Sequence, residues 1–249
     1  MIPQILPGSA DEFRLLTDAV GGKGYRQIDI NLGCPFPMIA GKHKGAGMLL
    51  YPAQVAEVLA PIAEYPEIQF SLKMRLGWEN ASECMVLVEL LNAIRLSRIA
   101  LHARTGKQQY KGHPDLEAFQ GFYELCQHPL YYNGGIESLS DIRQILTRFP
   151  LLKGVFIGRG LLSSPLLAKE FKGNETFLPE QRMSIYFAFH EELFSAYSQV
   201  LQGETQLLVK MKTLWEYFLP ETDRKLLKRI KKSTRLQQYT ESVKAIFTS

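Results

Sequence analysis

Short apolar segments alternate with helical segments over the first two thirds of the chain, and this alternation limits the fold more than any other feature. Strand-length apolar runs occupy residues 2–6, 27–31, 68–74, 98–102, 130–133 and 154–158. Apolar residues recur every three or four positions in between, which predicts helices over residues 10–20, 52–64, 82–93, 115–126 and 138–149, with Ser9, Ser82 and Ser138 or Ser140 as caps. Strands that alternate with helices predict an α/β fold with a parallel sheet.

The strand ends favour a closed barrel over an open, doubly wound sheet. Nearly every predicted strand ends in a reactive or ligand-binding residue type, and barrel enzymes carry their chemistry at that end. A TIM-type (β/α)8 barrel needs eight strands, and the sequence predicts about six. Since the chain opens directly on a strand, two further βα units are expected before Met1. A misassigned start, a gene fragment or a truncation would each explain this.

The pattern changes to helices alone beyond about residue 170. Apolar periodicity predicts helices over residues 180–201, 204–218, 223–235 and 240–247. We therefore expect two domains: an N-terminally incomplete barrel over residues 1–170 and a small all-α domain over residues 171–249.

Composition excludes several classes of protein. Hydrophobic residues make up 46% and charged residues 22% of the chain, which is typical of a folded globular protein. Three cysteines without ligand spacing indicate a reducing cytoplasm and no metal site. No stretch of about 18 apolar residues predicts a membrane span. The net charge of +4 is too small to indicate a nucleic-acid partner by itself.

The segment DINLGCP (29–35) places Cys34 on a turn directly after a predicted strand. A thiol in this position can act as a general acid, and Asn31 could bind a carbonyl or hydroxyl of the substrate. The alternative is a buried cysteine beside the turn residue Pro35.

Two pairs of basic residues alternate with apolar residues, so each pair points to one side of its strand. Lys73 with Arg75 forms one pair, and His102 with Arg104 forms the other. Cations at a barrel mouth need an anion, which a flavin ring, its phosphate or a nucleic-acid phosphate would supply. Salt bridges to acidic helix residues, or a histidine within the core, are the alternatives.

Two glycine motifs follow the last two predicted strands and indicate a phosphate site. These are Asn133-Gly134-Gly135 and Gly158-Arg159-Gly160. Glycines let backbone N–H groups approach a phosphate, and barrels commonly build phosphate sites from these two loops. The segment GKHKGAG (41–47) is a weaker signal, and we expect it to be a mobile or solvated basic loop.

These motifs, in this order, resemble those of the tRNA-dihydrouridine synthases over roughly residues 1–170. The similar motifs are NLGCP (31–35), KMRLG (73–77), HART with QQYKG (102–105 and 108–112), NGG (133–135) and GRG (158–160). The helical region is similar in position and size to the tRNA-binding domain of that family.

The resemblance implies an FMN-dependent enzyme that uses NADPH to reduce the C5–C6 bond of specific uridines in tRNA. It implies that Cys34 protonates C5, that Gln4, Lys73 and His102 contact the flavin, and that the loops at Gly134 and Gly158 hold its phosphate. We expect Asn31, Arg75 and Arg104 to bind the substrate. The uridine must leave the base stack to be reached. Gly135 stands where many relatives carry Asp, and the family's first two strands have no counterpart. FMN is therefore expected to bind this chain weakly or not at all, and a monomer is expected for a version with a closed barrel.

The helical region carries the basic residues that a tRNA enzyme needs. Residues 224–235 contain seven basic residues and no acidic residue, with an apolar face formed by Leu226, Leu227 and Ile230. We expect this helix to contact tRNA phosphates through Lys228, Arg229, Lys231 and Lys232, and the alternative is a solvated helix face. Two other functions remain open: an FMN barrel oxidoreductase with a small substrate, and a non-catalytic tRNA-binding remnant.

Overall fold

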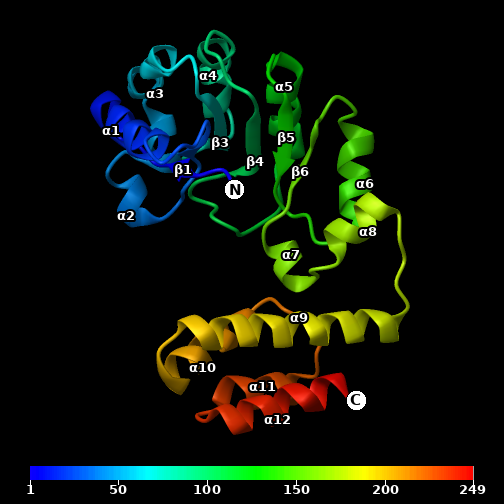
Figure 1. Cartoon of the computed structure of the whole chain (residues 1–249). Coiled ribbons are helices and arrows are strands. Elements are labelled where there is room, and N and C mark those ends of the chain that lie inside the picture. The colour runs from blue at the N-terminus through cyan, green and yellow to red at the C-terminus, as the bar shows by residue number, and fades with distance from the viewer. Residues whose placement is uncertain (249) are drawn as a thin grey trace. The chain divides into compact units, whose positions relative to one another are not determined.

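The first part of the chain folds into a parallel sheet whose strands lie in chain order. The computed structural model describes residues 1–248 and contains, within them, six strands in the order β1-β2-β3-β4-β5-β6 (Figure 1). The strands are β1 (Gln4–Ile5), β2 (Gln27–Leu32), β3 (Gln69–Gly77), β4 (Ile99–Thr105), β5 (Leu130–Asn133) and β6 (Gly154–Phe156). Every neighbouring pair is parallel. The predicted α/β fold and all six predicted strands are confirmed, and sequential parallel order is the strand order of a (β/α)8 barrel.

Helices connect the strands at the predicted places (Figure 1). They are α1 (Ala10–Gly21), α2 (Pro37–Ala40), α3 (Pro52–Leu59), α4 (Glu83–Asn92), α5 (Leu116–Leu125) and α6 (Leu139–Arg148). One α-helix was predicted over residues 52–64, but the structure forms a 3₁₀ helix from Ala60 to Glu64. Pro61 explains the change, because a proline in the helix interior removes an N–H donor and crowds the preceding turn.

Two of the predicted helix caps can be compared with the structure. Ser9 caps α1, since its hydroxyl accepts a hydrogen bond from the Glu12 N–H at 3.2 Å. The prediction for Ser82 is wrong, because that side chain makes no capping hydrogen bond. Instead the Glu83 carboxylate accepts hydrogen bonds from the backbone N–H groups of Trp78, Glu79 and Asn80. A carboxylate in the first turn of α4 also interacts favourably with the helix dipole.

The second part of the chain is all-helical. It contains α7 (Arg159–Ser163), α8 (Leu167–Gly173), α9 (Pro179–Val200), α10 (Gly203–Leu214), α11 (Arg224–Lys232) and α12 (Leu236–Phe247). Its compact unit comprises residues 136–140 and 157–249, and the sheet unit comprises residues 1–135 and 141–156. The structural division thus falls near residue 157, before the predicted boundary at residue 170. No helix within residues 1–248 has both the length and the apolar character needed to cross a membrane.

A buried hydrogen-bonded chain lies in the core of the helical unit. The Trp215 indole N–H donates to the Tyr239 hydroxyl oxygen at 2.9 Å, and that oxygen lies 2.7 Å from Nε2 of His190. His190 is 1% exposed, and its Nδ1 lies 3.0 Å from a carboxylate oxygen of Glu191. Burial lowers the pKa of His190 and raises that of Tyr239. Both groups are therefore neutral in the folded state near pH 7.

The burial of His190 predicts that the helical unit is sensitive to acid. His190 in the unfolded chain titrates near pH 6.5, whereas the folded protein resists its protonation. As the pH falls below 6.5, the unfolded state binds a proton that the folded state lacks, so the free energy of unfolding should fall by up to about 1.4 kcal/mol per pH unit. The measurement is urea unfolding followed by Trp215 fluorescence in a Trp78→Phe background. His190→Gln should show a shallower loss between pH 7 and 5.5. An equal loss in both proteins would contradict the assignment.

Candidate functional site

The sheet register brings the predicted site residues to one edge. Asn31 of β2 lies opposite Lys73 of β3, Arg75 lies opposite His102 of β4, and His102 lies opposite Asn133 of β5. Asn31, Arg75 and Asn133 lie in the C-terminal halves of their strands, and Lys73 and His102 lie at the midpoints of β3 and β4. Parallel strands in register therefore assemble residues that are up to about a hundred positions apart in the sequence.

A chain of polar side chains crosses β1, β2 and β3 beside this edge. The Asn31 amide donates to Oε1 of Gln4 at 2.7 Å, and the Gln4 amide donates to the Asp29 carboxylate at 2.6 Å. The Ser71 hydroxyl donates to the other oxygen of Asp29, also at 2.6 Å. Asp29 is 8% exposed and was not predicted as a site residue. An acidic residue inside an apolar strand was the signal that could have identified it.

Asn31 fixes the turn that carries Cys34. Its side-chain oxygen accepts hydrogen bonds from the backbone N–H groups of Gly33 and Cys34, both at 2.9 Å. Both ends of the Asn31 amide are thus occupied within the protein, although the sequence predicted a contact with substrate. Cys34 is half-buried, and its role as a general acid stays a prediction.

The second half of the segment 41–47 packs against this turn, so the prediction of a mobile or solvated loop is wrong for residues 45–47, whereas residues 41–43 are exposed. Ala46 donates its backbone N–H to the Cys34 carbonyl at 3.0 Å, and residues 45–50 form a 3₁₀ helix with buried glycines. A Cβ on Gly45, which has a φ of +57°, would lie 2.8 Å from Cβ of Cys34. The Lys44 ammonium binds the Glu12 carboxylate at 2.5 and 2.6 Å. Lys44 of this segment is thus paired within the protein.

Lys73 is a half-buried cation at the centre of the edge. Burial is the main cause that lowers its pKa, and the neighbouring charge of Arg75 lowers it further. Attraction to Asp29 and to Cys34 opposes these effects. An ammonium group that is both poorly hydrated and close to another cation is stabilised by a bound anion. Its position thus agrees with the predicted contact to a cofactor.

Arg75 is 1% exposed and bonds to the backbone of two loops. Its guanidinium donates to the Gly33 carbonyl at 3.0 Å, to the Thr105 carbonyl at 2.9 Å and to the Gln109 carbonyl at 2.7 Å. Burial lowers its pKa to about 10, which still leaves it charged at neutral pH. The predicted contact of Arg75 with substrate stays a prediction, and the structure gives this side chain a clear internal role.

His102 and Arg104 are buried together on β4, and each is 5% exposed. Nη1 of Arg104 lies 3.2 Å from Nε2 of His102. The Arg104 guanidinium also donates to the Gly112 carbonyl, from Nε at 3.3 Å and from Nη2 at 2.9 Å. The Tyr110 ring lies 6.3 Å from the His102 ring, centroid to centroid. The loop after β4 thus encloses the two predicted side chains.

The glycine loops follow β5 and β6. Asn133 joins these strands, since its side-chain amide donates to the Phe156 carbonyl at 2.8 Å. Gly134 and Gly135 have φ values of +128° and +63°, which residues with a side chain rarely adopt. Gly158 precedes α7, and a Cβ added there would meet nothing within 4 Å. Arg159 is the first residue of α7 and is half-buried.

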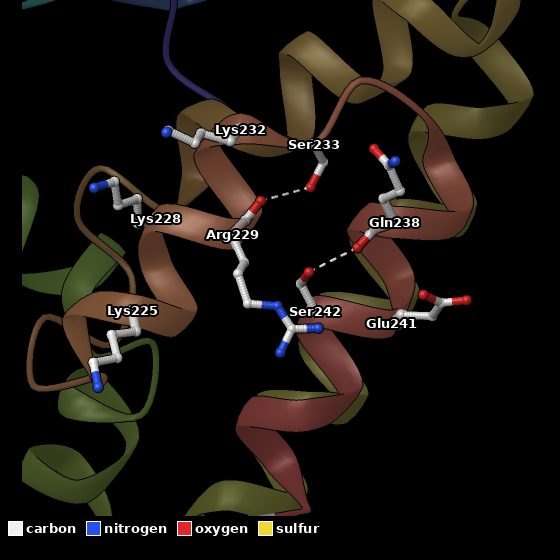
Figure 2. Close-up of a pocket in the computed structure, with 8 residues that line it drawn as sticks. All are labelled: Lys225, Lys228, Arg229, Lys232, Ser233, Gln238, Glu241 and Ser242. Carbon is white, nitrogen blue, oxygen red and sulfur yellow. Dashed lines mark hydrogen bonds between the residues drawn. The ribbon is translucent and has the colours of Figure 1, made fainter.

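A separate basic groove lies in the helical unit between α11 and α12. It encloses about 450 Å³ and is lined by Lys225, Lys228, Arg229, Lys232, Ser233, Gln238, Glu241 and Ser242 (Figure 2). In Figure 2 the Arg229 side chain extends from α11 towards α12.

Ile230 is fully buried in the helical core, with Leu226 and Leu227 packed against that core, so the predicted apolar face of α11 is confirmed. Of the four predicted tRNA contacts, only Lys231 lies outside this lining, and Lys225 joins it.

Hydrogen bonds hold the two walls of the groove. Asp223 caps α11, with its carboxylate accepting from the backbone N–H of Lys225 at 2.8 Å and of Leu226 at 3.2 Å. Ser233 donates to the Arg229 carbonyl at 2.9 Å, and Ser242 donates to the Gln238 carbonyl at 2.7 Å. The four basic side chains of the groove thus extend from a helix whose N-terminus is capped by Asp223.

Comparison with solved structures supports the fold of the sheet unit. A structure of morphinone reductase aligns with a TM-score of 0.50 and 14% sequence identity, over 70% of this chain and 51% of that one. At this identity the likeness concerns the fold alone.

Comparison of sequences identifies the family. A probable tRNA-dihydrouridine synthase from Rhizobium leguminosarum bv. phaseoli is 32% identical over 139 residues, which are 55% of this chain and 44% of the relative. The tRNA-dihydrouridine synthase B of Vibrio vulnificus is 27% identical over 161 residues, which are 63% of this chain and 50% of the relative. The chain spans about half the length of the curated relatives it matches. The family model for dihydrouridine synthase matches residues 4–248, and the chain therefore belongs to the dihydrouridine synthase family.

Proposed function

We propose that this chain forms the uridine-reducing and tRNA-binding parts of a tRNA-dihydrouridine synthase that uses FMN and NADPH and works in the cytoplasm. The observation that carries the proposal is the edge of the sheet, where a half-buried thiol, a desolvated lysine and a buried histidine come together. Membership of the dihydrouridine synthase family supports the choice of reaction.

The residues at this edge fit an anionic, planar cofactor. Lys73 is a half-buried cation beside a second cation, so an electron-rich ring or a phosphate would lower the electrostatic energy of the site. His102, which lies opposite Arg75 in the sheet, adds a hydrogen-bonding ring, and Gln4 adds an amide. Gly134 and Gly135, with their positive φ values, provide backbone that a phosphate can approach. The predicted phosphate contacts of Gly158 and Arg159 stay predictions. When bound, FMN reduced by NADPH would supply the hydride for C6 of the uridine.

Cys34 would supply the proton that completes the reduction at C5. General-acid catalysis needs a proton donor within hydrogen-bond reach of the reacting atom, and a fixed turn meets this need better than a mobile one. Asn31, Arg75 and the segment 45–50 hold that turn from three sides. In this proposal Asn31 acts on Cys34 as a positioning residue.

The α11–α12 groove would bind the tRNA backbone. Its basic residues give affinity for phosphate without reading the sequence. The uridine must leave the stack before it can meet Cys34, which costs a few kcal/mol that backbone contacts can offset. No metal is assigned a role.

The first test concerns the thiol. In the FMN-loaded protein, Cys34→Ala should leave FMN binding and its reduction by NADPH intact, because the thiol contributes to neither. Dihydrouridine formation should fall by about 10²-fold, a typical general-acid contribution. Flavin absorbance measures the first two steps, and mass spectrometry of digested tRNA measures the product. Undiminished product from the variant would remove Cys34 from the proton step.

The second test concerns the groove. Replacing Lys225, Lys228 and Lys232 by Ala should weaken tRNA binding and reduce the slope of log Kd against log salt by about two to three units, roughly one per lost phosphate contact. A matched variant, Lys210, Arg224 and Lys244 to Ala, removes the same charge outside the lining. Fluorescence anisotropy over a salt series gives both slopes. Equal slopes in the two variants would show that total charge matters and the groove does not.

The third test separates the two roles of Asn31. Asn31→Asp keeps an oxygen for the Gly33 and Cys34 N–H groups but loses the donor to Gln4, whereas Asn31→Ala loses both. Asn31→Ala should lose about 1–3 kcal/mol of unfolding free energy in urea, because two backbone donors become unpaired. Asn31→Asp should lose less. The reverse order of stability would assign the main role to the Gln4 contact.

A further inference from the structure

Arg104 was expected to bind substrate, but its contacts lie within the protein and include the ring of His102. The two side chains project from β4 two positions apart, and both are almost fully buried. The short distance from Nη1 of Arg104 to Nε2 of His102, 3.2 Å, is that of a hydrogen bond.

The direction of this bond follows from the chemistry of the two groups. A guanidinium has five N–H donors and no acceptor, and it stays protonated in proteins. Nε2 of His102 must therefore accept, with its lone pair directed at Arg104. The proton of the neutral imidazole then sits on Nδ1, because the partner of one ring nitrogen decides which nitrogen carries the proton.

Two further contacts fix this geometry. The Gly112 carbonyl accepts from both Nε and Nη2 of Arg104, so the guanidinium cannot turn away without losing both bonds. On the other side, a Cβ at Gly134 would lie 3.0 Å from Cδ2 and 3.3 Å from Nε2 of His102. The backbone of Gly134 thus packs directly on the edge of the ring that faces Arg104.

We propose that Arg104 is a positioning residue that holds His102 as the neutral Nδ1–H tautomer. The ring then offers one hydrogen-bond donor, Nδ1–H, to the bound cofactor, and Nε2 carries no proton that could pass to the substrate. A proton on Nε2 would oppose the N–H groups of Arg104, and Arg75 adds positive charge across the Tyr110 ring. The role toward the cofactor rests on the proposed function, whereas the tautomer is a property of the protein alone.

The test is ¹⁵N NMR of the full chain labelled at histidine, recorded without FMN or tRNA. The His102 signals are assigned by their loss in His102→Gln. At pH 7 the wild type should show a protonated Nδ1 and an unprotonated Nε2. Arg104→Lys keeps a group that can only donate and should preserve this pattern. Arg104→Gln can present its carbonyl oxygen and should shift His102 towards the Nε2–H form. Backbone amide spectra establish that both variants are folded.

FMN affinity supplies the second measurement. Arg104→Gln should raise the Kd for FMN about fivefold, the effect of one misdirected hydrogen bond, while Arg104→Lys should stay near the wild type. An Nε2–H tautomer or an imidazolium in the wild type would overturn the proposal. The proposal would also be overturned if the His102 tautomer, or the Kd for FMN, were the same in the wild type, Arg104→Lys and Arg104→Gln. Such a result would not contradict the proposed dihydrouridine formation, because that activity is measured separately on tRNA.

Discussion

The candidate site depends on one buried cation, the guanidinium of Arg75. It joins the turn after β2 to the loop after β4 by donating to the carbonyls of Gly33, Thr105 and Gln109. Each unpaired buried carbonyl would cost about 1–3 kcal/mol, so the loss of this side chain would release both loops together. The turn that carries Cys34 and the loop that encloses His102 therefore share one anchor. The sheet brings the strands together, and Arg75 determines how their loops meet.

Positive charge is concentrated at this edge, and a bound anion would relieve its desolvation. Lys73, Arg75 and Arg104 belong to adjacent strands, and burial lowers the pKa of both Lys73 and Arg75. Arg75 and Arg104 donate hydrogen bonds to backbone carbonyls, and these bonds replace the ones that burial removes from water. Lys73 gains most from an incoming anion, because charge repulsion from Arg75 adds to its burial. The two arginines thus shape the site, and the lysine is the group most able to bind a ligand.

Much of the fold could be predicted from the sequence, because apolar periodicity reports burial directly. All six strands were predicted, as was the apolar face of α11 with Ile230 at its centre. The boundary of the helical unit was harder to predict, since α7 and α8 continue the βα pattern in sequence while belonging to the second unit.

The site was predicted by residue type but not by role. Nothing in the spacing of Arg104 shows that its partner would be the His102 ring, and Asp29 was hidden among apolar neighbours. Such roles arise from contacts between strands, which a linear pattern does not contain.

The most direct test of the central claim is a single turnover in the absence of oxygen. The protein is loaded with FMN, reduced with NADPH, freed of excess nucleotide and mixed with unmodified tRNA while flavin absorbance is followed. The proposed function predicts that tRNA reoxidises the flavin and that one dihydrouridine forms per flavin reoxidised. If the flavin stays reduced with tRNA, yet is reoxidised once oxygen is admitted, the edge formed by Cys34, Lys73 and His102 does not reduce uridine.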